Sequence, residues 1–169
     1  MRNKYLQLLL VSNALIILDQ ITKFIVSIHI PLHHSLAVVK DFLSITHIRN
    51  AGVAFGLFAS QPSEYKALTF ITVSTVAIVA ILFIFHQTAD AKRLVQIGLT
   101  LILSGAVGNL IDRVLHGEVI DFLDFQIRGY HWPAFNLADS CITIGVGMMI
   151  IDLFQQGSHH SSGSSATPA

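Results

Sequence analysis

The stretch from Val119 to Ser140 joins two long apolar segments and runs V-I-D-F-L-D-F-Q-I-R-G-Y-H-W-P-A-F-N-L-A-D-S. It contains three aspartates, Asp121, Asp124 and Asp139, which are more acids than a connection between two apolar segments requires. The nature of the two flanking segments decides what these acids can do.

The composition of the chain indicates an integral membrane protein. Of its 169 residues, 53% are hydrophobic and only 12% are charged, and the mean hydropathy is +0.65. Soluble domains carry about 25% charged residues, roughly twice as many. The formal net charge is zero, so we expect no nucleic-acid partner. The single cysteine, Cys141, excludes a disulfide within the chain and a cysteine-based metal site.

Four apolar segments, at about residues 6–28, 67–85, 94–115 and 137–154, are long enough to cross a membrane. Each is close to the roughly 20 residues that a helix needs for this. They are too long and too continuous for the strands of a barrel. The sequence therefore predicts an all-α membrane protein, a bundle of four transmembrane helices within one domain of residues 1–156.

The first apolar segment follows two basic residues, Arg2 and Lys4, as a secretory signal peptide would. It is longer than the apolar core of such a peptide, and Asp19 and Lys23 interrupt it. We therefore expect a helix that is retained in the mature protein.

The segments outside the predicted spans differ in character. Residues 38–48, in the loop of residues 30–66, are rich in β-branched side chains and roughly alternate between apolar and polar, most clearly at 42–48. This pattern predicts a small β-sheet in that loop, at the outer face of the membrane. Residues 157–169 are rich in serine and glycine and are expected to be a disordered tail.

The number of basic residues in the loops does not decide how the chain is oriented in the membrane, but their clustering does. Basic residues divide evenly, four against four, between the two sides. However, Arg2 and Lys4 lie within the first four residues, and Lys92 and Arg93 lie in a short loop. We expect both regions to be cytoplasmic. Both termini then face the cytoplasm and the two longer loops lie outside.

Three of the predicted spans carry polar side chains at a similar depth. They are Asp19 and Lys23 in the first span, Asn109, Asp112 and Arg113 in the third, and Asp139 near the start of the fourth. Ionisable groups inside a span cost about 2.5–3.5 kcal/mol each and normally face the bundle interior. We therefore expect a polar cluster below the outer surface, with Asp139 about one turn, roughly 5 Å, inside its helix.

Structural roles explain several of these residues. Asp19 and Lys23, four residues apart, suit a stabilising pair, and Asp112 with Arg113 offers another. Small residues such as Gly105 allow close packing of helices. Asn136 followed by Asp139 matches an N-cap with an acid at the third helical position, which accounts for both residues if they stand alone.

The motifs in the sequence are compatible with few kinds of peptidase chemistry. The chain lacks the zinc-protease motif His-Glu-x-x-His, the Gly-x-Ser-Gly of intramembrane serine proteases and the Gly-x-Gly-Asp of presenilin-type proteases. His29, His33 and His34 have no acidic residue beside them, so we expect neither a metal nor a cofactor. A pair of aspartates remains, because two close carboxyls share one proton and can activate water.

Two other functions compete with catalysis. A small transporter would also carry intramembrane polar residues, but it needs them through the whole depth of the membrane. A noncatalytic assembly subunit would pair its charges with partner helices. Neither gives a reason for Asp121 in a loop that faces Asp139, 18 residues further along the chain.

Five segments, in order along the chain, resemble lipoprotein signal peptidase, also called signal peptidase II, of bacterial inner membranes. They are Asp19-Gln-Ile-Thr-Lys23, Asn50-Ala-Gly-Val-Ala-Phe-Gly56, Gly105-Ala-Val-Gly-Asn-Leu-Ile-Asp-Arg113, Val119-Ile-Asp-Phe122 and Phe135-Asn-Leu-Ala-Asp139. One departure is Ser104, where the family often has a second glycine. Since serine is also small, we expect an effect on local packing only.

The resemblance implies an aspartic endopeptidase that removes the signal peptide of diacylglyceryl-modified prolipoproteins, just before the lipidated cysteine. It assigns the catalytic pair to Asp121 and Asp139 and excludes Asp124. Residues implied to surround the substrate are Asn50, Gly52, Asn109, Arg113 and Asn136, and those implied to stabilise the site are Asp19, Lys23 and Asp112. It further implies an inner-membrane enzyme without cofactor, with the site toward the periplasm, in contact with membrane lipid. We expect a monomer.

Overall fold

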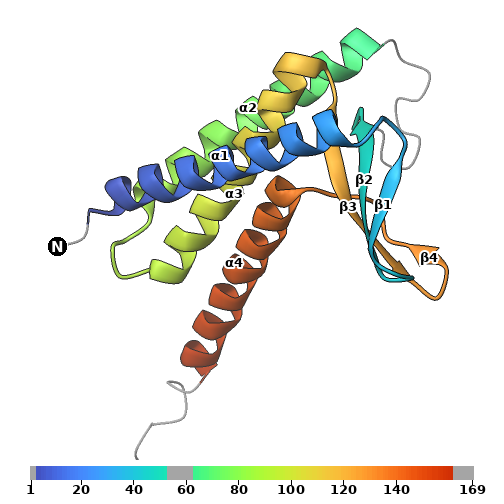
Figure 1. Cartoon of the computed structure of the whole chain (residues 1–169). Helices are drawn as coiled ribbons and strands as arrows, with labels where there is room; N and C mark the ends of the chain where they lie inside the picture. The colour runs from blue at the N-terminus through green and yellow to red at the C-terminus, as the bar shows by residue number, and fades with distance from the viewer. Residues whose placement is uncertain (1–2, 53–62, 162–169) are drawn as a thin grey trace, which may run out of the picture.

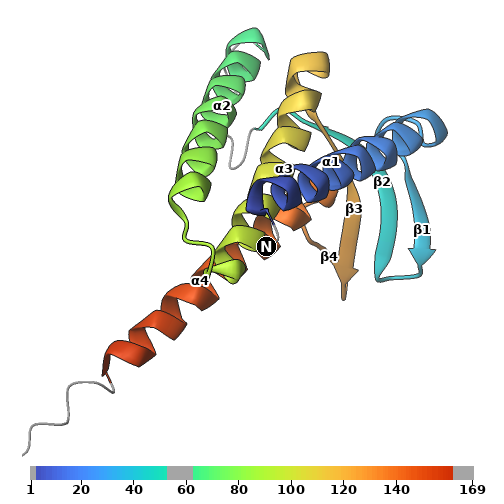
Figure 2. The ribbon, with the colours of Figure 1, turned by 90° about the vertical axis from the view of Figure 1, so that its left-hand side faces the viewer.

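The computed structural model of the chain describes residues 3–52 and 63–161. The helices and strands in these ranges follow one another as α1 (Lys4–His29), β1 (Ser35–Val39), β2 (Leu43–Asn50), α2 (Ser63–Gln87), α3 (Arg93–His116), β3 (Val119–Ile127), β4 (Tyr130–His131) and α4 (Leu137–Ser161) (Figure 1). The strands gather at the end of the helical bundle that lies away from the N-terminus (Figure 2).

The four helices in the described ranges are long and apolar enough to cross a membrane, which confirms the predicted spans. The helices extend somewhat beyond the predicted limits, because polar residues that flank the apolar segments are also helical. At the start of α1, the side chain of Asn3 accepts a hydrogen bond from the backbone N–H of Tyr5. This cap satisfies one of the first N–H groups, for which the helix has no carbonyl partner.

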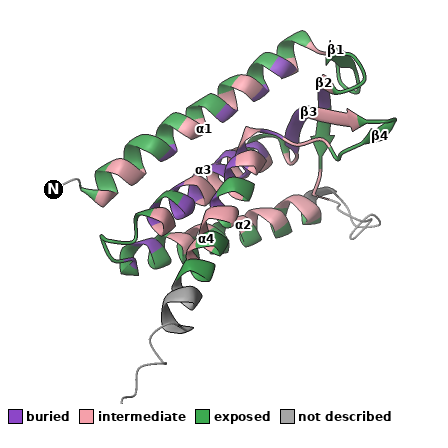
Figure 3. Cartoon of the chain, turned by 90° about the horizontal axis from the view of Figure 1, so that it is seen from below, coloured by how far each residue is buried: buried purple, intermediate pink, exposed green. Residues whose placement is uncertain are grey.

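Helix α3 is the centre of the bundle and packs against each of the other three helices. Half of its most apolar stretch is buried within the protein, compared with 6% for α2 (Figure 3). Small residues bring α3 close to α4, because a Cβ atom on Gly105 would collide with the carbonyl oxygen of Ala138. The predicted role of Gly105 in helix packing is therefore confirmed. Ser104 is buried, and its hydroxyl donates to the carbonyl of Thr100.

The starts and ends of the helices are staggered. The first turn of α4 lies against Gly105, near the middle of α3. From there α3 continues to His116, a distance of roughly 16 Å at 1.5 Å per residue. The chain must therefore return toward the bundle between α3 and α4, and strand β3 makes part of that return.

The prediction of a sheet confined to residues 30–66 was incomplete. The sheet is antiparallel with the strand order β1-β2-β3-β4, and its second half comes from the stretch after α3. Strand β2 pairs with β3 from Leu43 opposite Phe125 to Asn50 opposite Val119. The aspartates of β3 disguise it in the sequence, because aspartate is depleted in strands.

The predicted disordered tail begins too early at residue 157, because α4 continues to Ser161. Residues 162–169 lie outside the described residues. So do residues 53–62, which include the last four residues of the Asn50–Gly56 segment that resembles the family.

Candidate active site

Lys23 is the centre of a buried ionic cluster between α1 and α3. Its Nζ donates to Oδ2 of Asp19 at 2.8 Å, to Oδ2 of Asp112 at 2.9 Å and to Oδ1 of Asn109 at 3.1 Å. The side chains of Lys23 and both aspartates are each 2% exposed. All three ammonium hydrogens thus have acceptors. Asp112 bonds to Lys23 of another helix rather than pairing within its own helix with Arg113.

The two aspartates also connect this cluster to other elements. Oδ1 of Asp19 accepts a hydrogen bond from the backbone N–H of Ala138, in the first turn of α4, at 2.9 Å. Oδ2 of Asp112 accepts one from the backbone N–H of Ile120, in β3, at 3.2 Å. Gly108 leaves the necessary space, because a Cβ atom there would lie 2.7 Å from Asp19. The cluster therefore joins α1, α3, α4 and β3 at one point.

Asn136 and Asp139 form the capping box that their spacing predicts at the start of α4. The backbone N–H of Asp139 donates to the side-chain oxygen of Asn136 at 2.9 Å. In return, the backbone N–H of Asn136 donates to Oδ2 of Asp139 at 3.2 Å. A carboxylate in the first turn is also favoured by the positive end of the helix dipole.

The amides of Asn136 and Asn109 link the two candidate catalytic carboxyls. Asn136, which is fully buried, donates from Nδ2 to Oδ1 of Asp121 at 2.8 Å and to Oδ1 of Asn109 at 3.2 Å. Asn109 donates from Nδ2 to Oδ1 of Asp139 at 2.8 Å. Asp121 from β3 and Asp139 from α4 are therefore held in one network of hydrogen bonds.

Strand pairing places a further amide on Asp121. Asn50 of β2 lies opposite Val119 of β3, so Asp121 is its diagonal neighbour on the same face of the sheet. The Nδ2 of Asn50 donates to Oδ2 of Asp121 at 3.0 Å. Burial raises the pKa of Asp121 to about 6, and nearby Asp139 adds to the rise. The hydrogen bonds from Asn50 and Asn136 and the charge of Lys23 oppose this rise in pKa.

A cavity of about 350 Å³ opens beside Asp139. Its walls are Trp132, Phe135, Asp139, Ser140, Thr143 and Ile144. The hydroxyls of Ser140 and Thr143 donate to the backbone carbonyls of Asn136 and Asp139, so they do not offer hydrogens to an occupant. The cavity thus presents mainly apolar surface next to one carboxyl group. Of its other lining residues, Phe135 belongs to a segment that resembles the family, and the remaining four were not expected at the site.

Two residues that the family resemblance places around the substrate adjoin Phe70 of α2. Gly52 has a φ of +79°, its N–H donates to the side chain of Asn50, and a Cβ atom would collide with the Phe70 ring. The guanidinium carbon of Arg113 lies 5.4 Å from the centre of the same ring. Phe70 was missed because nothing distinguishes it from other apolar residues of a span.

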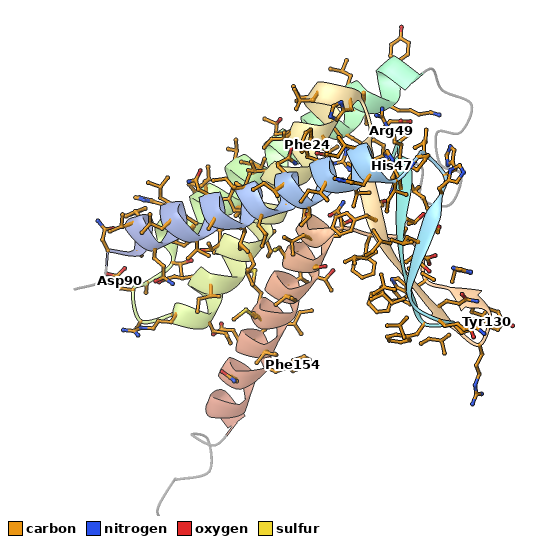
Figure 4. All side chains as sticks on the ribbon, viewed as in Figure 1. Phe24, His47, Arg49, Asp90, Tyr130 and Phe154 are labelled. Carbon is orange, nitrogen blue, oxygen red and sulfur yellow. The ribbon has the colours of Figure 1, made fainter. Side chains whose placement is uncertain are left out.

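Asp124 belongs to a different part of the molecule. It is three residues from Asp121 along β3, and an odd separation puts the two side chains on opposite faces of a strand. Asp124 pairs with His131 of β4, whose Nδ1 is 2.9 Å from its Oδ1. Figure 4 shows neighbouring Tyr130 at the tip of the sheet, away from the helices.

Gln20 is another residue that the sequence analysis missed. Its Nε2 donates to Oδ1 of Asp112 at 2.9 Å and to the carbonyl of Gly108 at 3.2 Å. Its position directly after Asp19 was the available signal. Within the described ranges, no group of three or more His, Cys, Asp or Glu side chains is arranged to hold a metal ion. The reactive groups that the site brings together are carboxyls and amides.

Comparison with known proteins assigns this arrangement to a family. Residues 11–155 match the family model described as signal peptidase (SPase) II. The lipoprotein signal peptidase of Syntrophus aciditrophicus is 44% identical over 156 residues, covering 92% of this chain and 97% of the relative. That of Desulforapulum autotrophicum is 48% identical over 144 residues, covering 85% of this chain and 89% of the relative.

Solved structures agree with the sequence relatives. Two structures, each described as a bacterial membrane enzyme, superpose with TM-scores of 0.80 and 0.78 at 34% and 38% sequence identity. They match 96% and 87% of this chain, and 94% and 92% of their own chains. The chain is a multi-pass membrane enzyme, and it belongs to the signal peptidase II family of peptidases.

Proposed function

We propose that this chain cleaves diacylglyceryl-modified prolipoproteins just before the lipidated cysteine, with Asp121 and Asp139 as the catalytic pair. Its role as a lipoprotein signal peptidase follows from the family. The observation that carries the assignment of the pair is the amide of Asn136. It donates to Asp121 while its own side-chain oxygen caps the helix turn that holds Asp139.

The pair acts by general acid–base catalysis on a water molecule. The ionised carboxyl removes a proton from the water, whose oxygen attacks the scissile carbonyl carbon, while the protonated carboxyl donates to the carbonyl oxygen. Collapse of the tetrahedral intermediate breaks the C–N bond, and a proton from the pair passes to the leaving amine. Burial raises the pKa of Asp121 to about 6, which favours this residue as the holder of the shared proton.

The surroundings of the pair suit a lipid-linked substrate. The cavity beside Asp139 is mainly apolar, as a site for a diacylglyceryl cysteine or an apolar signal peptide should be. Asn50, Gly52, Asn109, Arg113 and Asn136 are assigned to the substrate. Asn50 is the exposed member of this network, so its amide can exchange Asp121 for the substrate backbone.

The predicted orientation completes the proposal. The strands and the carboxyl pair then face the periplasm, and the turn between α2 and α3 faces the cytoplasm together with the termini. Cysteines introduced at Lys92 and at Arg128 separate these sides. A membrane-impermeant thiol reagent should label only the cysteine at position 128 in intact spheroplasts, and labelling confined to position 92 would reverse the orientation.

The test uses the purified full chain in liposomes and a precursor with a diacylglyceryl group on its lipobox cysteine. We expect a gel shift, with the lipidated cysteine as the new N-terminal residue by mass spectrometry. The same precursor without lipid should remain uncleaved, and a chelator should leave the rate unchanged. Cleavage at another bond, equal cleavage without lipid, or loss of cleavage with chelator would contradict the proposal.

A further inference from the structure

The Lys23 ammonium constrains the amide of Asn109, which is the first step from the buried ionic cluster to the catalytic pair. An ammonium group can only donate hydrogen bonds. Since Nζ of Lys23 lies 3.1 Å from Oδ1 of Asn109, the carbonyl end of that amide must face the lysine. The amino end then faces Asp139, whose Oδ1 is 2.8 Å away.

The reversed amide would be opposed at both of its ends. Its amino group would face the ammonium of Lys23, and its oxygen would face the carboxyl oxygen of Asp139. Asn109 is 5% exposed, so water has little access to compensate for these contacts. Lys23 itself is held by Asp19 and Asp112, at 2.8 and 2.9 Å. Lys23 and the two aspartates that hold it therefore determine the orientation of the Asn109 amide.

The same constraint passes from Asn109 to a second amide. The oxygen of Asn109 also accepts from Nδ2 of Asn136, at 3.2 Å. With its amino end turned that way, Asn136 donates to Asp121 and keeps its oxygen for the backbone N–H of Asp139. Both carboxyls consequently face amide donors.

We propose that Lys23 is a positioning residue for the peptidase reaction, because it fixes which end of Asn109, and through it of Asn136, faces Asp121 and Asp139. This inference rests on the proposed function of the two aspartates. It assigns Lys23 a role beyond stabilising the fold. A purely stabilising lysine would affect the amount of folded enzyme but not the turnover of the folded fraction.

The decisive variant neutralises the whole cluster. Lys23→Met alone would leave two buried carboxylates without a counter-ion, so it is combined with Asp19→Asn and Asp112→Asn. The new amides can still accept from the backbone N–H groups of Ala138 and Ile120. We expect a folded enzyme whose kcat for the lipidated precursor falls about 10- to 100-fold and whose KM changes by much less, because the donors beside the pair are no longer held in place.

A double-mutant cycle separates positioning from stability. Asn109→Leu should lower kcat strongly in the wild-type background but by no more than about threefold in the neutral-cluster variant, because the two changes remove one interaction. Gln20→Met is the matched control. Gln20 donates to Asp19 and Asp112 of the same cluster but forms no hydrogen bond with Asn109, so this variant should lower the unfolding temperature and leave kcat per folded enzyme unchanged.

A second variant tests the orientation without altering Lys23. Asn109→Asp keeps an acceptor for the lysine but presents an oxygen, instead of an amino group, to Asp139. We expect kcat to fall as far as in Asn109→Leu. Full activity of Asn109→Asp, or independent effects in the cycle, would overturn the role of Lys23. Absence of cleavage by the wild-type enzyme would instead contradict the proposed function itself.

Discussion

Helix α1 carries one lysine near each end, and the two lysines have opposite surroundings. Lys4 donates to the carbonyl of Thr88 at 2.8 Å and pairs at 3.5 Å with Asp90, whose side chain is 88% exposed. Lys23 bonds to two aspartates that are each 2% exposed. In Figure 4, Asp90 lies at the end of the bundle near the N-terminus, and His47 lies at the end near the sheet.

The difference shows what burial does to one kind of side chain. Lys4 closes the end of α2 in contact with solvent, where an ion pair contributes little. Lys23 has no solvent to replace its partners, so each of its contacts has to be satisfied within the protein. Lys23 can therefore set the arrangement of several elements, whereas Lys4, whose side chain is 15% exposed and whose ion-pair partner Asp90 is exposed, caps one.

The largest effect on cleavage is expected from Asn136→Ala, beside the carboxyl pair. This change removes the side-chain cap of α4 and the donor to Asp121 together. We expect cleavage to fall at least about 100-fold and the free energy of unfolding to fall by about 1–2 kcal/mol. The measurements are gel-shift cleavage and thermal unfolding in detergent.

The control for this variant is Asn3→Ala, at the exposed start of α1. Asn3 also caps a helix, through the backbone N–H of Tyr5, but lies far from the carboxyl pair. We expect the loss of stability, about 1 kcal/mol, without loss of cleavage. Equal cleavage by Asn136→Ala and Asn3→Ala would show that Asn136 has no role in catalysis beyond capping its helix.

Replacing each of the two lysines should have clearly different effects on the free energy of unfolding. Lys23→Met should lower the free energy of unfolding by about 3–5 kcal/mol, because it leaves buried carboxylates unpaired. Lys4→Met should lower it by no more than about 1 kcal/mol. Denaturant unfolding of both variants in the same detergent provides the comparison. Similar losses of unfolding free energy would mean that Lys23 stabilises the protein no more than Lys4 does.

The pH dependence of stability should report on Asp121. Its pKa is about 6 in the folded protein against an ordinary value of 3.8, so the folded state holds the proton more tightly than the unfolded chain. The free energy of unfolding should therefore fall as the pH rises from about 4 to about 6, by on the order of 2 kcal/mol.

The variant Asp121→Asn isolates this contribution, because its side chain does not titrate. Relative to the wild type, it should gain stability as the pH rises from about 4 to about 6. Thermal unfolding at several pH values measures the difference. A difference that does not change with pH would mean that Asp121 has an ordinary pKa in the folded protein.

The smallest effect is expected from Asp124→Asn. Asp124 lies on the opposite face of β3 from Asp121 and bonds to His131 near the tip of the sheet. We expect cleavage to change by less than about twofold. A loss comparable to that of an Asp121 variant would place the wrong acid in the pair.

Much of the fold could be predicted because membrane helices follow from hydropathy and length. The capping box could also be predicted, since Asn136 and Asp139 act within four residues of sequence. The strand β3 could not, because its pairing with β2 joins segments on either side of two spans. Its aspartates also argue locally against a strand.

The site was predictable in its members but not in its connections. Family motifs name Lys23 and Asp112, yet only the packing of α1 on α3 shows that they bond to each other. The cavity walls, such as Trp132 and Ile144, carry no signal in the sequence because similar residues occur on every lipid-facing surface. Both the bonds within the ionic cluster and the walls of the cavity depend on contacts between segments that are distant in the sequence.

The central claim is that Asp121 and Asp139 together carry out the cleavage. The most direct measurement is the cleavage rate of the lipidated precursor by Asp121→Asn and by Asp139→Asn, each corrected for the folded fraction. The account predicts that both variants fold and bind the precursor but cleave it at less than about one hundredth of the wild-type rate. Cleavage at the wild-type rate by either folded variant would contradict it.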